Sequence, residues 1–216
     1  QEMLALFRYN ITTSGKNLWA TVNDDTPEKK FLRWNALCRG NSKDEGDDFR
    51  NAPNTFGWVV EIDPFNPTAP IKKRTALGRF AHEGAWPGII IENEPLVWYM
   101  GCDATHEYIY KYISENNWDI SDSSKGISAG DKYLDNGKLY AARFNENGTG
   151  EWLELKFGVS NISKSSYPYS FKNQADVLIH ARLAADAVGA TKMDRPEWGA
   201  VNPQNGEVYM TLTCNP

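Results

Sequence analysis

Cysteine and long apolar runs are both scarce in this chain. Its three cysteines, Cys38, Cys102 and Cys214, stand far apart, so the spacing of a zinc ribbon or of a redox pair is absent. They allow at most one disulfide, and a small buried side chain is the commonest role for each. No apolar stretch reaches the roughly 18 residues that a membrane span needs, and no charged-then-apolar leader opens the chain. We therefore expect no membrane partner and no targeting segment within these residues.

Positive charge is also in deficit. The chain has 23 Lys and Arg against 28 Asp and Glu, a formal net charge of −5, and its one basic run is Lys72–Arg74. A nucleic-acid partner is therefore excluded, because phosphate backbones are bound through a basic face. The sequence contains no G-x-S-x-G elbow, phosphate-binding loop, dinucleotide fingerprint or H-E-x-x-H helix. These absences remove the common hydrolase, nucleotide-binding and zinc-protease interpretations.

What the chain does have is the composition of a β-rich globular protein. Of its 216 residues, 41% are hydrophobic and 12% aromatic, and aromatic side chains favour strands. Residues 1–55 show little periodicity and contain the acidic cluster 44–48, which predicts a long irregular segment. That cluster is either a solvated loop or a calcium ligand set. From residue 56 to residue 216 we expect one domain of strands.

Four pairs of short strands are predicted in this second part. Asn147-Gly148 and Asn205-Gly206 provide turns for the last two, since Asn and Gly tolerate positive φ. Repeated pairs at intervals of some tens of residues favour blades of a β-propeller over a closed sandwich. The predicted pairs are 56–62 with 74–80, 96–100 with 107–113, 138–144 with 151–155, and 198–201 with 207–212.

One helix is predicted between the strands, over residues 173–188. Its apolar side chains recur at helical spacing, as at Leu178, Ala181 and Ala185. Asn173 can cap its start, and Gly189 can take the left-handed conformation that ends a helix. This helix leads the chain directly into the segment 191–198.

The segment 191–198 contains the first candidate site. Pro196 keeps Arg195 out of the right-handed helical region and predicts an extended backbone, in which Arg195 and Glu197 point to one surface. A guanidinium beside a carboxylate suits an anion held near a metal cation. The alternative is an ordinary ion pair that closes a loop.

Two further stretches carry candidate ligands at predicted strand ends. His82 and Glu83 follow the strand predicted at 74–80, and the small residues after them allow close approach of a ligand. Glu83 is the better candidate for a metal, because a lone histidine is more often structural. Asp103 could bind a hard cation, although Asp after Gly is also a good turn former.

Taken together, these motifs resemble the PhoX family of bacterial alkaline phosphatases. The resemblance rests on 56–64, 76–85, 99–101, 107–111 and 193–198, together with Gly206–Tyr209. It implies a six-bladed β-propeller, exported by the twin-arginine route and therefore secreted or periplasmic. It also implies hydrolysis of small phosphate monoesters with iron and calcium ions. Glu83 and Glu197 match carboxylates at the family's metal cluster, and Arg195 matches the arginine that contacts phosphate.

The chain departs from the family in length and in cysteine. Family members are much longer, and none of Cys38, Cys102 and Cys214 occupies the motif of the iron-binding cysteine. Where many relatives have two successive acids, this chain has Cys102 before Asp103. We therefore expect an internal fragment of two to three blades, whose open edges favour association with other segments.

Two other functions remain open from the residues alone. A non-catalytic propeller that binds a partner would need neither metal nor Glu197. A glycoside hydrolase would use Glu83 and Glu197 as its acid and base, although Arg195 beside Glu197 favours an anionic substrate.

Overall fold

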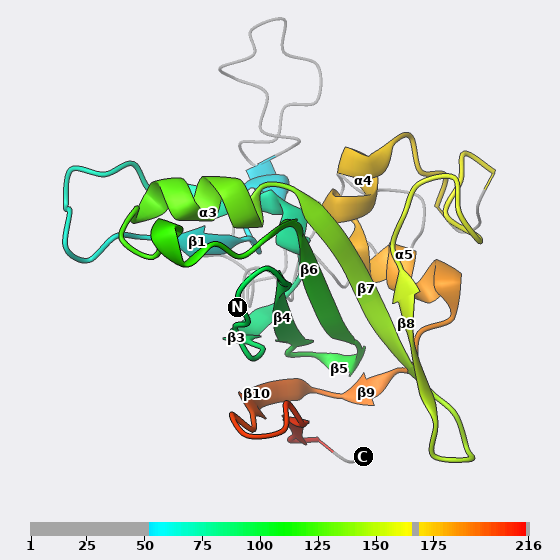
Figure 1. Ribbon diagram of the computed structural model, residues 1–216. Helices are drawn as coiled ribbons and strands as arrows, with labels where there is room; N and C mark the ends of the chain where they lie inside the picture. The colour runs from blue at the N-terminus through cyan, green and yellow to red at the C-terminus, as the bar shows by residue number, and fades with distance from the viewer. Residues whose placement is uncertain (1–51, 166–168, 215–216) are drawn as a thin grey trace, which may run out of the picture. The chain divides into compact units, whose positions relative to one another are not determined.

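The computed structural model describes residues 52–165 and 169–214 (Figure 1). The chain divides into two compact units, Gln1–Gly57 and Trp58–Pro216. Of the first unit, only residues from the short 3-10 helix η3 (Ala52–Thr55) onward are described. Most of the irregular segment predicted at 1–55, its acidic cluster 44–48 and Cys38 lie outside the described residues.

The second unit is mainly β, as predicted, and its largest element is a five-stranded antiparallel sheet. The second and third predicted strand pairs both belong to this sheet, so they are not separate hairpins. The turn between the last two strands is the one predicted, with Gly148 at φ 82° and a hydrogen bond of 3.0 Å from its amide to the carbonyl of Asn145. In spatial order the strands are β3 (His82–Pro87), β4 (Pro95–Cys102), β6 (Ile109–Asn117), β7 (Gly137–Phe144) and β8 (Gly150–Glu154).

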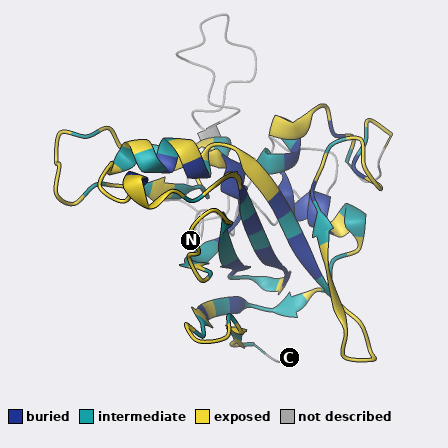
Figure 2. Cartoon of the chain, viewed as in Figure 1, coloured by how far each residue is buried: buried dark blue, intermediate teal, exposed yellow. Residues whose placement is uncertain are grey.

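The core lies where this sheet meets two short helices, α4 (Gln174–Ile179) and α5 (Ala181–Val188). Figure 2 shows buried residues concentrated on the central strands and on α5. Small side chains let the helix approach closely, since Ala181, Ala184 and Ala185 are all fully buried. Burial of such apolar surface is the main stabilising contribution to the fold. Cys102 is buried here as a free thiol, and Cys214 is a half-buried free thiol.

The single helix predicted over 173–188 is broken at His180, which has φ −113° and ψ 41°. Both predicted ends are confirmed. The side chain of Asn173 accepts a hydrogen bond of 2.9 Å from the amide of Asp176, and Gly189 has left-handed φ 74° and ψ 40°. The break was not predicted, because helical spacing continues across it. The helix α3 (Ile127–Leu134) and the 3-10 turn η5 (Ile120–Asp122) were also not predicted.

The first predicted strand pair is only partly correct. β1 (Val59–Glu61) pairs with β2 (Lys72–Arg74), but residues 75–77 form the 3-10 turn η4 (Thr75–Leu77), so the strand predicted at 74–80 is wrong beyond Arg74. The amide of Gly78 closes this turn on the carbonyl of Thr75 at 3.1 Å. Gly78 has φ 81°, a conformation that ends the strand pairing there.

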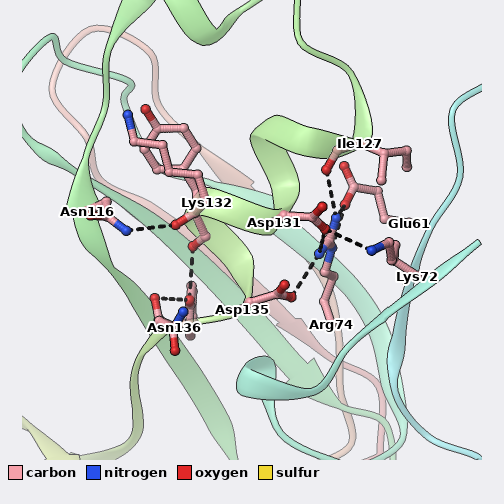
Figure 3. A network of polar contacts seen from close by, with 11 residues as sticks. Glu61, Lys72, Arg74, Asn116, Ile127, Asp131, Lys132, Asp135 and Asn136 are labelled. Carbon is pink, nitrogen blue, oxygen red and sulfur yellow. Dashed lines mark hydrogen bonds and ion pairs between the residues drawn. The ribbon is translucent and has the colours of Figure 1, made fainter.

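Arg74 ties the β1–β2 pair to α3 in the polar network of Figure 3. Its guanidinium is fully buried and contacts Glu61, while Nη1 donates hydrogen bonds of 2.8 Å to both Asp131 and Asp135. Nη2 donates a further hydrogen bond of 3.1 Å to the carbonyl of Ile127. All three carboxylates therefore neutralise one buried cation, which fixes α3 in place.

Two smaller strand pairs complete the unit. β10 (Pro196–Val201) and β11 (Val208–Leu212) form the predicted C-terminal hairpin, with Gly206 at φ 76° in its turn. β5 (Thr105–Glu107) pairs with β9 (Met193–Asp194). The described strands therefore form one large sheet and three two-stranded pairs, and they do not by themselves show propeller blades. Over the described ranges, no helix is long and apolar enough to cross a membrane.

Candidate functional site

Arg195 lies in an unusual backbone conformation between β9 and β10. Its φ is 58°, in the left-handed region that residues with a side chain seldom adopt. The predicted extended backbone is therefore wrong at this residue, although Pro196 does keep it out of the right-handed helical region. Such conformations persist only where the surrounding structure enforces them, and they cluster at functional sites.

The side chains of Arg195 and Glu197 nevertheless meet, as predicted. Arg195 Nη2 lies 3.0 Å from Oε1 of Glu197, and the same nitrogen lies 2.8 Å from Oδ1 of Asp103. The hydroxyl of Thr213, from the segment after β11, also donates a hydrogen bond to Glu197. One guanidinium nitrogen thus bridges two carboxylates that are far apart in the sequence.

Asp103 reaches this site because two strand pairings converge there. It directly follows β4, and its amide donates a hydrogen bond of 2.9 Å to the carbonyl of Ala81. The β5–β9 pairing then places Thr105 opposite Asp194, the residue before Arg195 (Figure 1). The candidates from the ends of β4 and β9 are therefore brought together by backbone pairing.

Glu83 belongs to the same electrostatic site. Burial raises the pKa of Asp103, and the nearby negative charges of Glu197 and Glu83 raise it further, while Arg195 opposes the shift. Glu83, Glu197 and Arg195 therefore all act on Asp103, and these three carboxylates and one guanidinium carry two surplus negative charges when all are ionised. Such a concentration of negative charge suits a cation.

Two glycines allow β10 to cross the sheet closely. A Cβ on Gly101 of β4 would lie 2.6 Å from the carbonyl oxygen of Pro196, and one on Gly199 of β10 would lie 2.5 Å from the Trp86 ring. Contacts this short leave no room for a side chain. Neither contact was predicted from the sequence; the signal that could have indicated Gly101 is its position two residues before Asp103.

His82 does not share the site of Glu83, because its side chain packs against Gly78 and Phe80. It begins β3, so the predicted position after a strand is wrong. Its Nε2 lies 2.9 Å from the carbonyl of Gly78, and its ring stacks on Phe80 with centroids 3.6 Å apart. Burial lowers the pKa of His82 to about 4, and the contact with Gly78 only partly opposes this. His82 is thus a neutral, packed side chain.

The carboxylates of the site offer the oxygen atoms that a hard cation prefers, but they are too few to complete its ligand set. Calcium takes six to eight oxygen ligands in proteins, and Glu83, Asp103 and Glu197 offer such oxygens. Across residues 52–165 and 169–214, however, no three acidic, histidine or cysteine side chains converge closely enough to hold a metal ion. These residues would therefore supply only part of a ligand set.

Comparison with known proteins identifies the family of this chain. Residues 20–216 match the family described as "Alkaline phosphatase PhoX". No curated protein matches the chain.

Among solved structures, the chain is similar to Pseudomonas fluorescens PhoX in complex with vanadate, a transition state analogue. The two share 42% sequence identity with a TM-score of 0.70, over 89% of this chain and 34% of that protein's chain. The chain thus spans about a third of the length of this relative. From the family match and this identity together, we conclude that the chain belongs to the PhoX family of alkaline phosphatases.

Proposed function

We propose that the protein containing this chain hydrolyses small phosphate monoesters at a metal-dependent site of the PhoX type. The observation that carries the proposal is the Arg195 guanidinium held between Asp103 at 2.8 Å and Glu197 at 3.0 Å, within the field of Glu83. Arginine is suited to grip phosphate oxygens, and the acids around it are suited to cations.

The charge of the site explains why metal would be needed. Two surplus negative charges repel a phosphate ester, so the acids must be neutralised before Arg195 can attract one. In this proposal Glu83 and Glu197 hold metal, Asp103 assists them, and Arg195 contacts the phosphoryl oxygens. Bound calcium and iron would polarise those oxygens and activate the attacking oxygen.

Arg195 would then stabilise the negative charge that gathers on the transferring phosphoryl group. A donor that is already fixed in position lowers the activation barrier most, because it need not reorganise during the reaction. The left-handed backbone of Arg195, its two carboxylate contacts and the close approach of Pro196 to Gly101 all limit its movement.

Three further properties belong to the proposal through family membership. The complete protein would be a six-bladed β-propeller, to which this chain contributes two to three blades with α4 and α5 inserted. It would be secreted or periplasmic. The open edges of its sheets, such as β3 and β8 of the largest one, would pair with other segments of the same polypeptide or of another chain.

The test is hydrolysis of an aryl phosphate at alkaline pH by the full-length protein, with calcium and iron measured by elemental analysis. We expect turnover that is lost with a chelator and restored by metal. Glu83→Gln and Glu197→Gln should each lower activity and metal content, whereas Glu146→Gln, in the exposed β7–β8 turn, should change neither. Activity that survives complete removal of metal would overturn the proposal.

The same assay separates the two alternatives left open by the sequence. Chelator-insensitive release of sugar from an aryl glycoside would favour a glycoside hydrolase that uses Glu83 and Glu197. A metal-free protein with no turnover of either substrate would favour a non-catalytic binding module.

A further inference from the structure

The segment that follows β11 returns to the candidate site. The amides of Thr213 and Cys214 donate hydrogen bonds of 3.2 and 3.3 Å to the carbonyl of Asp194, the residue before Arg195. These two bonds add to the β5–β9 and β10–β11 pairings, which also converge on this part of the chain. The backbone of Thr213 is therefore fixed beside the segment that carries Arg195 and Glu197.

The side chain of Thr213 binds the Glu197 carboxylate at one of its two oxygens. The hydroxyl donates a hydrogen bond to Oε1 of Glu197, and the same oxygen lies 3.0 Å from Nη2 of Arg195. Within the described part of the chain, Oε2 of Glu197 makes neither a hydrogen bond nor an ion pair. The two oxygens of this carboxylate therefore have different surroundings.

The Glu197 carboxylate needs such polar contacts to fix its orientation. Its side chain is 24% exposed, and the torsion that turns a carboxylate has broad, two-fold preferences. A carboxylate has about four lone-pair positions on its two oxygens. With Thr213 and Arg195 both at Oε1, the lone pairs of Oε2 remain for a cation.

We propose that Thr213 is a positioning residue, which holds Oε1 of Glu197 beside Arg195 and leaves Oε2 to bind the metal. The inference rests on the proposed function, in which Glu197 is a metal ligand. Outer hydrogen bonds of this kind orient ligating side chains, and their loss typically weakens metal binding by about 10- to 100-fold. The alternative is that the hydroxyl only helps to hold the C-terminal hairpin together.

The test measures metal affinity in the full-length protein after its metal has been removed with a chelator. The protein is dialysed against a series of calcium or iron concentrations, and the bound metal is measured by elemental analysis. The relevant metal is the one whose binding Glu197→Gln weakens. Thr213→Val keeps the branched side-chain shape but lacks the hydroxyl, and it should raise the dissociation constant of that metal by about tenfold or more. Thr213→Ser keeps the hydroxyl and should remain within about threefold of the parent.

Thr211→Val is the matched control, because Thr211 lies in the same hairpin and does not contact Glu197. Its hydroxyl accepts a hydrogen bond of 3.0 Å from the amide of Trp198 and donates one of 3.2 Å to the carbonyl of that residue. The control variant should therefore lower the melting temperature while its dissociation constant for metal stays within about twofold of the parent. A purely structural role of Thr213 predicts the same result for Thr213→Val.

A double variant shows whether Thr213 acts through Glu197. In a Glu197→Gln background, Thr213→Val should weaken metal binding by less than about twofold further, because the carboxylate that it orients is already gone. Two losses that simply multiply would show that Thr213 acts independently of Glu197, and would overturn the proposal.

Three other results would also overturn the positioning role. These are a Thr213→Val variant that binds metal like the parent, an equal loss of affinity in Thr211→Val, and a loss that Thr213→Ser does not restore. Each of them leaves the proposed function intact, provided that Glu197→Gln itself weakens metal binding. If Glu197→Gln binds both metals like the parent, the proposed role of Glu197 as a ligand fails together with that of Thr213.

Discussion

Arg74 and Arg195 each hold carboxylates from distant parts of the chain, but in very different surroundings. The Arg74 side chain is 0% exposed, and its hydrogen bonds go to Glu61, Asp131 and Asp135 (Figure 3). The Arg195 side chain is 40% exposed and contacts two acids from a left-handed backbone. An arginine among acids therefore does not by itself indicate function.

The difference lies in what remains available to a ligand. Burial lowers the pKa of Arg74, but the hydrogen bonds that its guanidinium donates to Asp131, Asp135 and Glu61 outweigh burial and raise the pKa overall. That guanidinium is fully committed to structure. Beside Arg195, the pKa of Asp103 is raised by burial and by neighbouring acids, although Asp103 forms an ion pair with that arginine. Asp103 there is under-neutralised, which is the state that a cation would relieve.

Replacing Arg195 should have the largest effect. Arg195→Met should lower kcat on an aryl phosphate by about 1000-fold, roughly 4 kcal/mol of activation free energy, because the transition state loses a fixed charged donor. The melting temperature should change little, since the side chain is exposed. Steady-state kinetics and a thermal melt check both, and a loss of activity under tenfold would contradict the assignment.

Replacing Arg74 should show the opposite pattern. Arg74→Met should lower the free energy of unfolding by about 3 kcal/mol, because three acids lose their shared counter-charge. Activity per folded molecule should stay within about twofold. Chemical denaturation with a parallel assay measures both quantities. Unchanged stability would show that the network in Figure 3 contributes little.

Gly101→Ala should lower both activity and stability, whereas Arg195→Met should lower mainly activity and Arg74→Met mainly stability. The added Cβ would meet the carbonyl of Pro196 at 2.6 Å, so β10 must shift, at a cost of about 2 kcal/mol in stability. Because Pro196 lies between Arg195 and Glu197, activity should also fall by about tenfold. Gly88→Ala is the control, since its nearest contact would be an acceptable 3.4 Å. Equal behaviour of the two variants would remove Gly101 from the account.

The smallest effect concerns the pH dependence of stability in chelator-treated protein. Asp103 has a native pKa above its ordinary value of 3.8, so the native state binds its proton more tightly than the unfolded state. The stability of the native state should therefore fall as the pH rises from the ordinary pKa of Asp103 through its raised native pKa. Asp103→Asn cannot lose a proton, so its melting temperature relative to wild type should rise between pH 4 and pH 7, by about 2 °C. A constant difference across that range would contradict the shift.

The turns and the helix ends of the fold could be predicted from local sequence. Asn147-Gly148 and Asn205-Gly206 located two hairpins, and Asn173 and Gly189 located the ends of the helical segment, because turns and caps depend on neighbouring residues. The break at His180 and the early end of β2 could not be predicted in this way. Both depend on packing between segments that are distant in the sequence.

The candidate site likewise combines features that local sequence predicts with features that depend on distant segments. Arg195, Glu197 and Glu83 could be proposed from their motifs and from the family resemblance. The contact of Arg195 with Asp103 depends on the β5–β9 pairing and on the closeness of Gly101 to Pro196, which no local pattern encodes. The roles of Glu83 and Glu197 as metal ligands and of Arg195 in phosphate binding remain predictions.

The most direct test of the central claim is competitive inhibition by inorganic phosphate, measured for the full-length protein and for Arg195→Lys at matched metal content. Lysine keeps the charge but loses the bidentate geometry. We expect the inhibition constant for phosphate to rise by about tenfold or more. An inhibition constant that does not change would show that Arg195 does not contact phosphate, and would contradict the account.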